Sequence, residues 1–405
     1  KEAAEKKHVA IDVNDLIKTD DQRREILKEI EARRAEQNFF SQKIPQANEN
    51  EKEGIFIEMR KLKEDLQKRE GELKEVMKKW QSLMLQVPNI PDVSVPEGAS
   101  DEDNLEIRTW GEIPKFSFSA KSHIELAEQH DLADFKRGTA VSGFRGYFLK
   151  NEGATLSFAL WNFFVRHLTA DGFTPMIVPS MVNKETLLGT GYLPQGEDDL
   201  YKTQDEMYLS GTAEVATMSY LADTVLEEKD LPLKFVSFSP CFRREAGSYG
   251  KDTKGLMRVH EFFKVEQVVI CEASHQTSVK HHEELTANAE TLMQKLGIPY
   301  RVVANCGGDL GLGQVKKYDI EAWVPSEGKY RETHSASYFH DFQTRRLNIR
   351  YRDKDGKLRF AHSLNDTAVA TPRVLIPLLE NHQREDGSII IPESLREYFG
   401  KEKIG

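Results

Sequence analysis

An arginine and a glutamate near the middle of the chain have the types and spacing needed to bind a nucleotide. They lie in Phe242-Arg243-Arg244-Glu245, directly after a β-rich run over residues 235–239. Side chains on a strand alternate between its two faces, so we expect Arg243 and Glu245 to share one face. An arginine fork can clamp an α-phosphate, and a carboxylate can accept a hydrogen bond from the adenine amino group. A plain hairpin with an Arg–Glu pair at its surface fits the same spacing.

A second strand is predicted over residues 259–270, after a glycine-rich loop. Alternation puts His260, Phe262, Lys264 and Glu266 on one face of this strand. An aromatic ring can stack on adenine, and a carboxylate can bind the ammonium group of an amino acid. The two strands therefore indicate either a cleft for a nucleotide and an amine or an ordinary hairpin.

Two later segments add oxygen donors and another cation. Glu332 and Ser335 lie three residues apart, and their oxygens could hold Mg²⁺, although a helix N-terminal capping box has the same spacing. The segment 365–373 is predicted to lead into a helix with Pro372 at its start. Arg373 then falls in the first turn, where the helix dipole disfavours a cation unless it faces a bound phosphate.

The segments that must position these residues differ in charge. The first 87 residues hold 19 basic and 19 acidic side chains, and the rest of the chain carries the whole net charge of −10. This balance excludes a generally basic protein that coats nucleic acid, but not a local RNA-binding patch. Three scattered cysteines exclude a disulfide framework or a Cys-x-x-Cys zinc site. No apolar run approaches the ~20 residues of a membrane span, so we expect a soluble, cytoplasmic protein.

A heptad pattern runs through the second half of the N-terminal segment. Its apolar positions step by four and three residues, with Arg69 as the one polar position, and they are Ile55, Met59, Leu62, Leu66, Leu73, Val76, Trp80, Leu83 and Val87. The first half is weaker, and a turn is predicted over residues 41–50 around Pro45. The pattern predicts an antiparallel helical hairpin of about 45 Å at 1.5 Å per residue. A dimerisation coiled coil and a helical core segment remain alternatives.

Composition changes again after the helical segment. Prolines and acidic residues mark a linker from residue 88, and a mixed α+β domain follows to the C-terminus. Within it, apolar residues at helical spacing over 156–167 are followed by a strand over 173–179 that ends in proline. Such a helix and strand are common, and alone they indicate little about function.

Taken in order, these segments resemble the seryl-tRNA synthetases, a family of class II aminoacyl-tRNA synthetases. The helix and strand ending at Pro179 resemble motif 1, residues 242–266 resemble motif 2, and residues 365–373 resemble motif 3. Segments particular to the serine family stand at their expected places, and they are Pro88-Asn89-Ile90-Pro91, Ser94-Val95-Pro96, Gly211-Thr212-Ala213-Glu214 and Tyr318-Asp319-Ile320-Glu321. The resemblance covers nearly the whole chain.

The resemblance implies an α+β fold, in which helices flank a six- or seven-stranded antiparallel sheet. It also implies an N-terminal antiparallel two-helix coiled-coil arm. Residues 1–87 would be the arm that binds serine tRNA, 88–110 a linker and 111–405 the catalytic domain. Members of the family are homodimers through motif 1, and the arm of one subunit reaches tRNA bound on the other.

The implied activity is that of a ligase that uses ATP and Mg²⁺ to activate L-serine and then transfers it to the 3′-end of serine tRNA. By match to the motifs, the expected catalytic residues are Arg243, Glu332 and Arg373. The expected L-serine site comprises Thr212, Ala213, Glu214, Arg243, Glu266, Asn365 and Thr367. The expected ATP site comprises Arg243, Arg244, Glu245, Val259, Phe262, Glu332, Thr333, His334, Ser335 and Arg373. Glu332 and Ser335 would ligate Mg²⁺, and no zinc is expected.

Two residues depart from the family pattern. Asp92 stands in the linker where histidine is frequent, and Asp366 stands where glycine or asparagine is usual. We expect Asp366 to add a negative charge next to the amino-acid pocket. The run His281-His282-Glu283-Glu284 invites a metal interpretation, but a solvated helix face is the simpler one.

Two other functions are compatible with a synthetase-like chain. One is a non-catalytic paralogue, which should have lost the nucleotide-binding Arg243, Glu245, Glu332 and Arg373; all four are present. The other is a relative that charges a carrier protein, for which a long tRNA-binding arm would have no use. Whether selenocysteine tRNA is also a substrate stays open.

Overall fold

The computed structural model describes residues 1–405, which form two compact units. One unit comprises residues 1–5 and 9–88, and the other comprises residues 6–8 and 89–405. A short helix, α1 (Glu2–Lys6), begins the chain. None of the helices combines the length and the apolar composition that crossing a bilayer requires.

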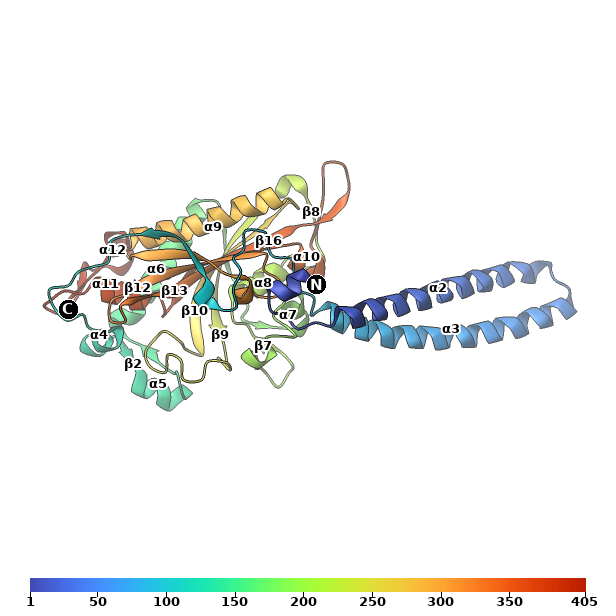
Figure 1. Cartoon of the computed structure of the whole chain (residues 1–405), viewed down its shortest axis with the longest axis horizontal. Coiled ribbons are helices and arrows are strands. Elements are labelled where there is room, and N and C mark those ends of the chain that lie inside the picture. Colours follow the sequence, from blue (N-terminus) through green and yellow to red (C-terminus); the bar gives the residue numbers. More distant parts are fainter. The chain divides into compact units, whose positions relative to one another are not determined.

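The predicted helical hairpin is confirmed in the N-terminal unit. Helices α2 (Val13–Lys43) and α3 (Glu49–Met84) run antiparallel (Figure 1), joined by the 3₁₀ turn η1 (Ile44–Gln46). The turn ends at the Asn48 cap of α3, where a capping box with Glu51 satisfies free N–H groups. Ile26 and Ile30 of α2 pack against Leu66 of α3.

Arg69, the one polar residue of the heptad seam, has an ionic partner on the other helix. Its Nε lies 3.0 Å from Oε2 of Glu29, and Arg34 and Glu70 form a second bridge at 2.7 Å. Arg33 and Asp65 form a third. These pairs set the register of the two helices without requiring a continuous apolar seam.

The second unit is built on an eight-stranded sheet (Figure 1). All neighbours pair antiparallel except the edge strand β4, which runs parallel to β9. In spatial order the strands are β1 (Leu105–Trp110), β11 (Tyr300–Ala304), β12 (Lys316–Val324), β13 (Lys329–His340), β16 (His362–Thr371), β10 (Glu261–Cys271), β9 (Leu233–Phe242) and β4 (Thr174–Ile177). The sheet thus has more strands than expected, because residues 105–110 pair with β11 at its far edge.

Helices and small sheets surround the main sheet. The helices are α4 (His123–Gln129), α5 (Phe135–Ser142), α6 (Asn151–Ala170), α7 (Lys184–Thr190), α8 (Ala213–Ser219), α9 (His275–Lys295), α10 (Phe342–Leu347), α11 (Leu375–Asn381) and α12 (Glu393–Phe399). The short strands are β2 (Ala133–Asp134) with β3 (Phe148–Leu149), β5 (Met181–Val182), β6 (Tyr201–Lys202) and β7 (Tyr208–Leu209), β8 (Val225–Glu227), β14 (Arg350–Arg352) and β15 (Leu358–Phe360), and β17 (Ile389–Ile390) with β18 (Lys403–Ile404).

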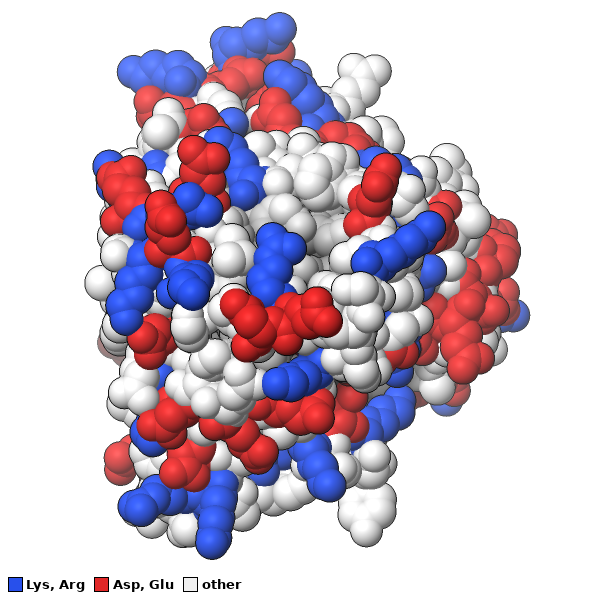
Figure 2. All heavy atoms as spheres, turned by 90° about the vertical axis from the view of Figure 1, so that its left-hand side faces the viewer, with Lys and Arg blue, Asp and Glu red and all other residues white.

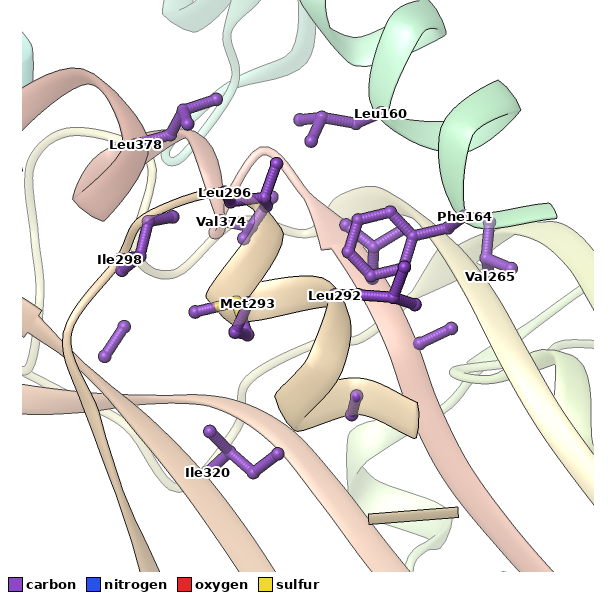
Figure 3. Close-up of a cluster of buried hydrophobic side chains, with 14 of the residues drawn as sticks. Leu160, Phe164, Val265, Leu292, Met293, Leu296, Ile298, Ile320, Val374 and Leu378 are labelled. Carbon is purple, nitrogen blue, oxygen red and sulfur yellow. The ribbon is translucent and has the colours of Figure 1, made fainter. Parts of the chain in front are cut away.

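The main core lies on the face of the sheet that α6 and α9 cover. Leu292 and Leu296 of α9, Phe164 of α6 and Val265 of β10 belong to one buried cluster (Figure 3). Burying a side chain of this size contributes about 1.5–3 kcal/mol. Strand side chains alternate between the two faces, so those that do not point into this core lie on the other face of the sheet.

Three local predictions are wrong. Residues 332–335 belong to strand β13, so the helix-cap alternative does not apply. Residues 365–371 belong to strand β16, and helix α11 begins only at Leu375, so Arg373 lies before the helix. The predicted solvated face on α9 is also wrong, because His281 and His282 are buried, and Nε2 of His282 lies 3.0 Å from the Ala336 carbonyl. Packing against the sheet outweighed the polarity of that run.

Charges of both signs cover the surface. On the face shown in Figure 2, acidic and basic side chains are interspersed rather than separated into a single basic field. This mixing agrees with the exclusion of a protein that coats nucleic acid through overall positive charge.

Candidate active site

A pocket of about 500 Å³ opens on the sheet face opposite the main core. Because side chains alternate along a strand, the first half of β10 contributes every second residue to the pocket and turns the residues between to the other face. Phe262, Lys264 and Glu266 of β10 line it, whereas the intervening Val265 is part of the core. Strand β16 contributes Asn365 and Thr367 to the lining. Strand β13 contributes Glu332, Thr333, Ser335 and Ser337.

The arginines Arg243 and Arg373 line the pocket. The guanidinium of Arg243 lies 5.2 Å from the centre of the Phe262 ring, and its Nη2 donates to the Gly211 carbonyl at 3.4 Å. A Cβ on Gly211 would lie 3.3 Å from Cγ of Arg243, so glycine permits this close approach. Arg373 donates to the main-chain oxygens of Met257 and Glu332, and its Nη1 lies 3.5 Å from the Glu332 carboxylate.

Glu245 reaches the pocket by a turn rather than by strand alternation. Strand β9 ends at Phe242, and Glu245 has a φ of +54°, in the left-handed region that non-glycine residues seldom adopt. Its carboxylate accepts from Nη1 of Arg258 at 2.5 Å. The strained turn therefore presents a carboxylate, already paired with Arg258, to the pocket.

The pocket is also lined by two buried carboxylates. Glu214 accepts from the Tyr192 hydroxyl at 2.9 Å and from the Gln343 amide at 2.5 Å, and Glu266 is paired with Lys264. The Asn365 amide joins them, donating to Glu214 at 2.8 Å and to Glu266 at 3.2 Å. The Oδ1 atom of Asn365 is buried and has no hydrogen-bond partner. A buried acceptor left in this state indicates a place for a ligand donor.

The pKa values of two carboxyl groups are shifted in opposite directions. Burial raises the pKa of Glu214 to about 7, and the neighbouring Glu266 adds to this effect. For Glu332, desolvation by itself would raise the pKa, but the cations Arg373, Lys317 and Arg243 outweigh it and lower this pKa. The pocket therefore combines an ionised carboxylate near the arginines with a carboxyl group poised near neutral pH.

Most of the predicted site residues line this one pocket. They are Glu214, Arg243, Glu245, Val259, Phe262, Glu266, Glu332, Thr333, Ser335, Asn365, Thr367 and Arg373. Thr212 is buried just behind the wall, where its hydroxyl lies 3.5 Å from the Glu266 carboxylate and caps helix α8. Ala213 is buried in the first turn of that helix.

Two predicted site residues, Arg244 and His334, point elsewhere, and so does His260, which strand alternation had put on the face of Phe262. Arg244 donates to the Asp198 carbonyl at 2.9 Å, outside the pocket. His334 lies on the core face of β13, where Nε2 is 2.9 Å from the Ala368 carbonyl and burial lowers its pKa to about 4. His260 precedes strand β10 and lies beside Tyr201 in a separate cavity, so it does not share the face of Phe262.

Asp366 does not add charge to the amino-acid pocket. It lies on the opposite face of β16 from Asn365 and Thr367, is fully buried, and accepts from the Gln267 amide at 3.1 Å. Burial and the charge of Glu266 raise its pKa well above the usual range. The expectation of an extra negative charge beside the pocket is therefore wrong, because the strand turns this side chain away.

Several residues of the pocket were not predicted as site residues. Lys264 could have been found, since it alternates with Phe262 and Glu266 on β10. Tyr192, which lines the pocket, and Gln343, which is not a lining residue, come from distant segments and carry no local signal, although both donate to the Glu214 carboxylate. Their roles follow only from the tertiary contacts.

Comparison with known proteins gives matches along the chain. A family model described as "Seryl-tRNA synthetase N-terminal domain" matches residues 1–91, and one described as "tRNA synthetase class II core domain (G, H, P, S and T)" matches residues 197–382. A serine–tRNA ligase of Deinococcus radiodurans is 46% identical over 405 residues, covering 100% of this chain and 95% of that protein.

Two solved structures have the same fold over almost the whole chain. The crystal structure of seryl-tRNA synthetase from Pyrococcus horikoshii complexed with ATP has a TM-score of 0.90 at 42% identity, covering 97% of this chain and 93% of that one. The cytoplasmic serine–tRNA ligase of Naegleria fowleri in complex with AMP has a TM-score of 0.87 at 30% identity, covering 100% and 94%. By fold and full-length sequence similarity, this chain belongs to the seryl-tRNA synthetase family of class II aminoacyl-tRNA synthetases.

Proposed function

We propose that this chain activates L-serine with ATP and transfers the seryl group to the 3′-terminal adenosine of serine tRNA. The observation that carries the proposal is a single pocket whose lining includes two arginines, Arg243 and Arg373, and two buried carboxylates, Glu214 and Glu266. The arginines suit the phosphates of ATP, and the buried carboxylates suit the ammonium group of an amino acid. The match to serine–tRNA ligases along the whole chain supports the same function.

In the first step, an oxygen of the serine carboxylate attacks the α-phosphorus of ATP. The bond between the α-phosphorus and its bridging oxygen breaks, and pyrophosphate leaves with that electron pair. Arg243 neutralises the α-phosphate and orients the carboxylate, while Arg373 neutralises the departing phosphates. Phe262 and Glu245 hold the adenine. The rate gain then comes from positioning and from charge neutralisation, and no general base is required.

In the second step, a hydroxyl of the terminal adenosine of tRNA attacks the carbonyl carbon of the seryl adenylate. The new ester bond forms as the bond between that carbon and the phosphate oxygen breaks, and the hydroxyl proton passes to the phosphate of the departing AMP. Arg243 stays beside the phosphate and stabilises the charge that develops on AMP.

The donor set near Arg373 fits a magnesium ion. Glu332 supplies a carboxylate and Ser335 a hydroxyl, and both line the pocket. Mg²⁺ prefers oxygen ligands and is usually held by one or two protein groups together with substrate phosphates. When bound there with ATP, it would add positive charge against the phosphates.

We assign the selectivity for serine to the part of the pocket around Asn365, Glu214 and Glu266. The unpaired Oδ1 of Asn365 offers an acceptor for the serine hydroxyl, and Glu214 and Glu266 offer acceptors for the ammonium group. Alanine would leave the buried acceptor unpaired, a penalty that can support rejection on the order of 10⁴-fold. Threonine must be refused by the size of the pocket, since attraction to one methyl group is worth only about 1–3 kcal/mol.

The remaining assignments extend the proposal to the whole molecule. Residues 1–87 would be the tRNA-binding arm, 88–110 a connecting segment and 111–405 the catalytic domain. A second copy of the chain would cover the apolar groove of α6 and β4, where the edge strand β4 is unpaired on one side and Phe158 and Ile177 are exposed. We place the enzyme in the cytoplasm, and selenocysteine tRNA is a candidate second substrate.

The direct test measures ATP–pyrophosphate exchange with each of the twenty amino acids, followed by charging of a tRNA with a long variable arm. We expect exchange with serine far above every other amino acid, and serine esterified to the tRNA. Exchange without transfer to tRNA would favour the carrier-protein alternative. No exchange with any amino acid would favour the non-catalytic paralogue.

The buried Glu214 predicts a pH dependence for serine binding. Its pKa of about 7 means that the empty pocket carries less negative charge below pH 7, while the serine ammonium stays charged. We expect the KM for serine to fall as pH rises from 6 to 8, by up to about tenfold per unit on the acid side. Exchange kinetics across this range measure it. Glu214→Gln, which cannot ionise, should have a raised KM and no such pH dependence; an unchanged pH profile in this variant would contradict the assignment.

A further inference from the structure

One loop of the pocket wall is held by segments that lie on either side of the helical hairpin in the sequence. The loop is Gly311-Leu312-Gly313-Gln314, and all four residues line the pocket. Lys7 precedes α2 and Asn89 follows α3, and both belong to the same compact unit as the loop. Neither residue lines the pocket itself.

Lys7 is buried against the main chain of this loop. Its side chain is only 4% exposed, and Nζ donates to the carbonyl oxygens of Gly311 at 3.1 Å, Leu312 at 3.0 Å and Gln314. The three hydrogens of the ammonium group thus meet three acceptors. Burying an ammonium group without a carboxylate partner is costly, so the loop must be arranged to receive it.

Asn89, which follows the hairpin in the sequence, makes further hydrogen bonds to the loop. Its main-chain N–H donates to the Leu312 carbonyl at 2.9 Å, and its Nδ2 donates to the carbonyls of Gly313 at 3.0 Å and Phe339 at 2.7 Å. All four carbonyl oxygens of the loop are therefore taken by Lys7, by Asn89 or by both. The glycines of this loop leave its backbone free to be set by these contacts.

The loop is in turn linked to the part of the pocket around Asn365, Glu214 and Glu266, which we assign to the amino acid. Oε1 of Gln314 accepts from the Gly311 N–H at 2.6 Å, and Nε2 of Gln314 donates to the Ser337 hydroxyl at 2.8 Å. Ser337 lies opposite Asn365 in the β13–β16 register. Asn365 is the residue that bridges the two carboxylates, Glu214 and Glu266.

We propose that Lys7 and Asn89 are positioning residues for serine binding. They act through Gln314 and Ser337, which keep Asn365 and the pocket wall in the geometry that receives the amino acid. Their printed contacts are to the loop and to Phe339, and not to Arg243 or Arg373, so their effect should fall on serine rather than on ATP. This inference rests on the proposed function, since it assigns residues to the same site.

The test compares point variants of the full chain in ATP–pyrophosphate exchange. Lys7→Met keeps a long side chain but removes all three donors, and we expect the KM for serine to rise by about tenfold or more. The KM for ATP and kcat should change by less than about threefold. Lys7→Arg retains the charge and several donors and should recover most of the serine affinity. Lys6→Met is the matched control, because Nζ of Lys6 binds the Val95 carbonyl and Glu97 instead of the loop.

The outcomes separate the inference from the proposed function. If the wild-type chain shows serine-dependent exchange and Lys7→Met has an unchanged KM for serine, the inference is overturned but the proposed function stands. An equal loss in the serine KM, the ATP KM and kcat also overturns the inference, since that would indicate general disruption. If Lys7→Met does not fold, Asn89→Ser carries the same test, because it removes only the donors to Gly313 and Phe339. A wild-type chain without serine-dependent exchange contradicts the proposed function itself.

Discussion

Replacing Arg243 by alanine is expected to abolish adenylate formation, with a loss of kcat/KM on the order of 10³-fold or more. This guanidinium lies against Phe262 in the wall of the pocket, and we assign it to both the serine carboxylate and the α-phosphate. Removal of one preorganised donor to a developing charge typically costs 10²–10³-fold. Here the same group also brings two reacting anions together, so the loss should lie at or above that range.

Serine-dependent ATP–pyrophosphate exchange measures this effect, and the neighbouring arginine supplies the control. Arg244→Ala removes the same charge one residue away, but Arg244 binds the Asp198 carbonyl outside the pocket. We expect that variant to retain exchange within a few-fold of wild type. Both variants should sediment like the wild-type protein. Near-normal exchange in Arg243→Ala would contradict the assignment of the pocket.

Glu332→Gln is the second change with a large expected effect. The cations around Glu332 lower its pKa, so it is ionised at neutral pH and available to a divalent cation. An amide cannot supply that charge, and it also leaves Arg373 without its carboxylate partner at 3.5 Å. We expect exchange to fall by about 10²–10³-fold at ordinary magnesium concentrations and to recover in part when magnesium is raised.

A glutamate on the same β-hairpin provides the matched control for this variant. Glu327 pairs with Arg331 at 2.7 Å and does not line the pocket. Glu327→Gln should therefore have normal activity and the same magnesium requirement as wild type. If Glu332→Gln behaved like this control, Glu332 could not be a magnesium ligand.

The fold was predictable from the sequence where local patterns are long. The heptad from Ile55 to Val87 predicted the antiparallel hairpin, and even the polar Arg69 is accommodated by Glu29. The family motifs predicted the antiparallel sheet with flanking helices. Long patterns succeed because many residues must agree on one period, so a single exception changes little.

The direction of individual side chains was less predictable. His334 and Asp366 stand inside motifs that line the pocket, yet both point into the core. Arg373 was expected in a helix that in fact begins at Leu375. A shift of one residue along a strand reverses the face, and register shifts occur in the pairing of β12 with β13 and of β10 with β16.

By itself, the sequence determined the family, the helical arm and the residue types of the pocket, because these depend on spacing and order along the chain. The tertiary structure decided which of those residues meet. It brought Tyr192 and Gln343 to Glu214, turned Asp366 away, and placed Lys7 beneath the Gly311–Gln314 loop. Such contacts join residues far apart in the sequence, and their energies depend on burial and partners that no local pattern records.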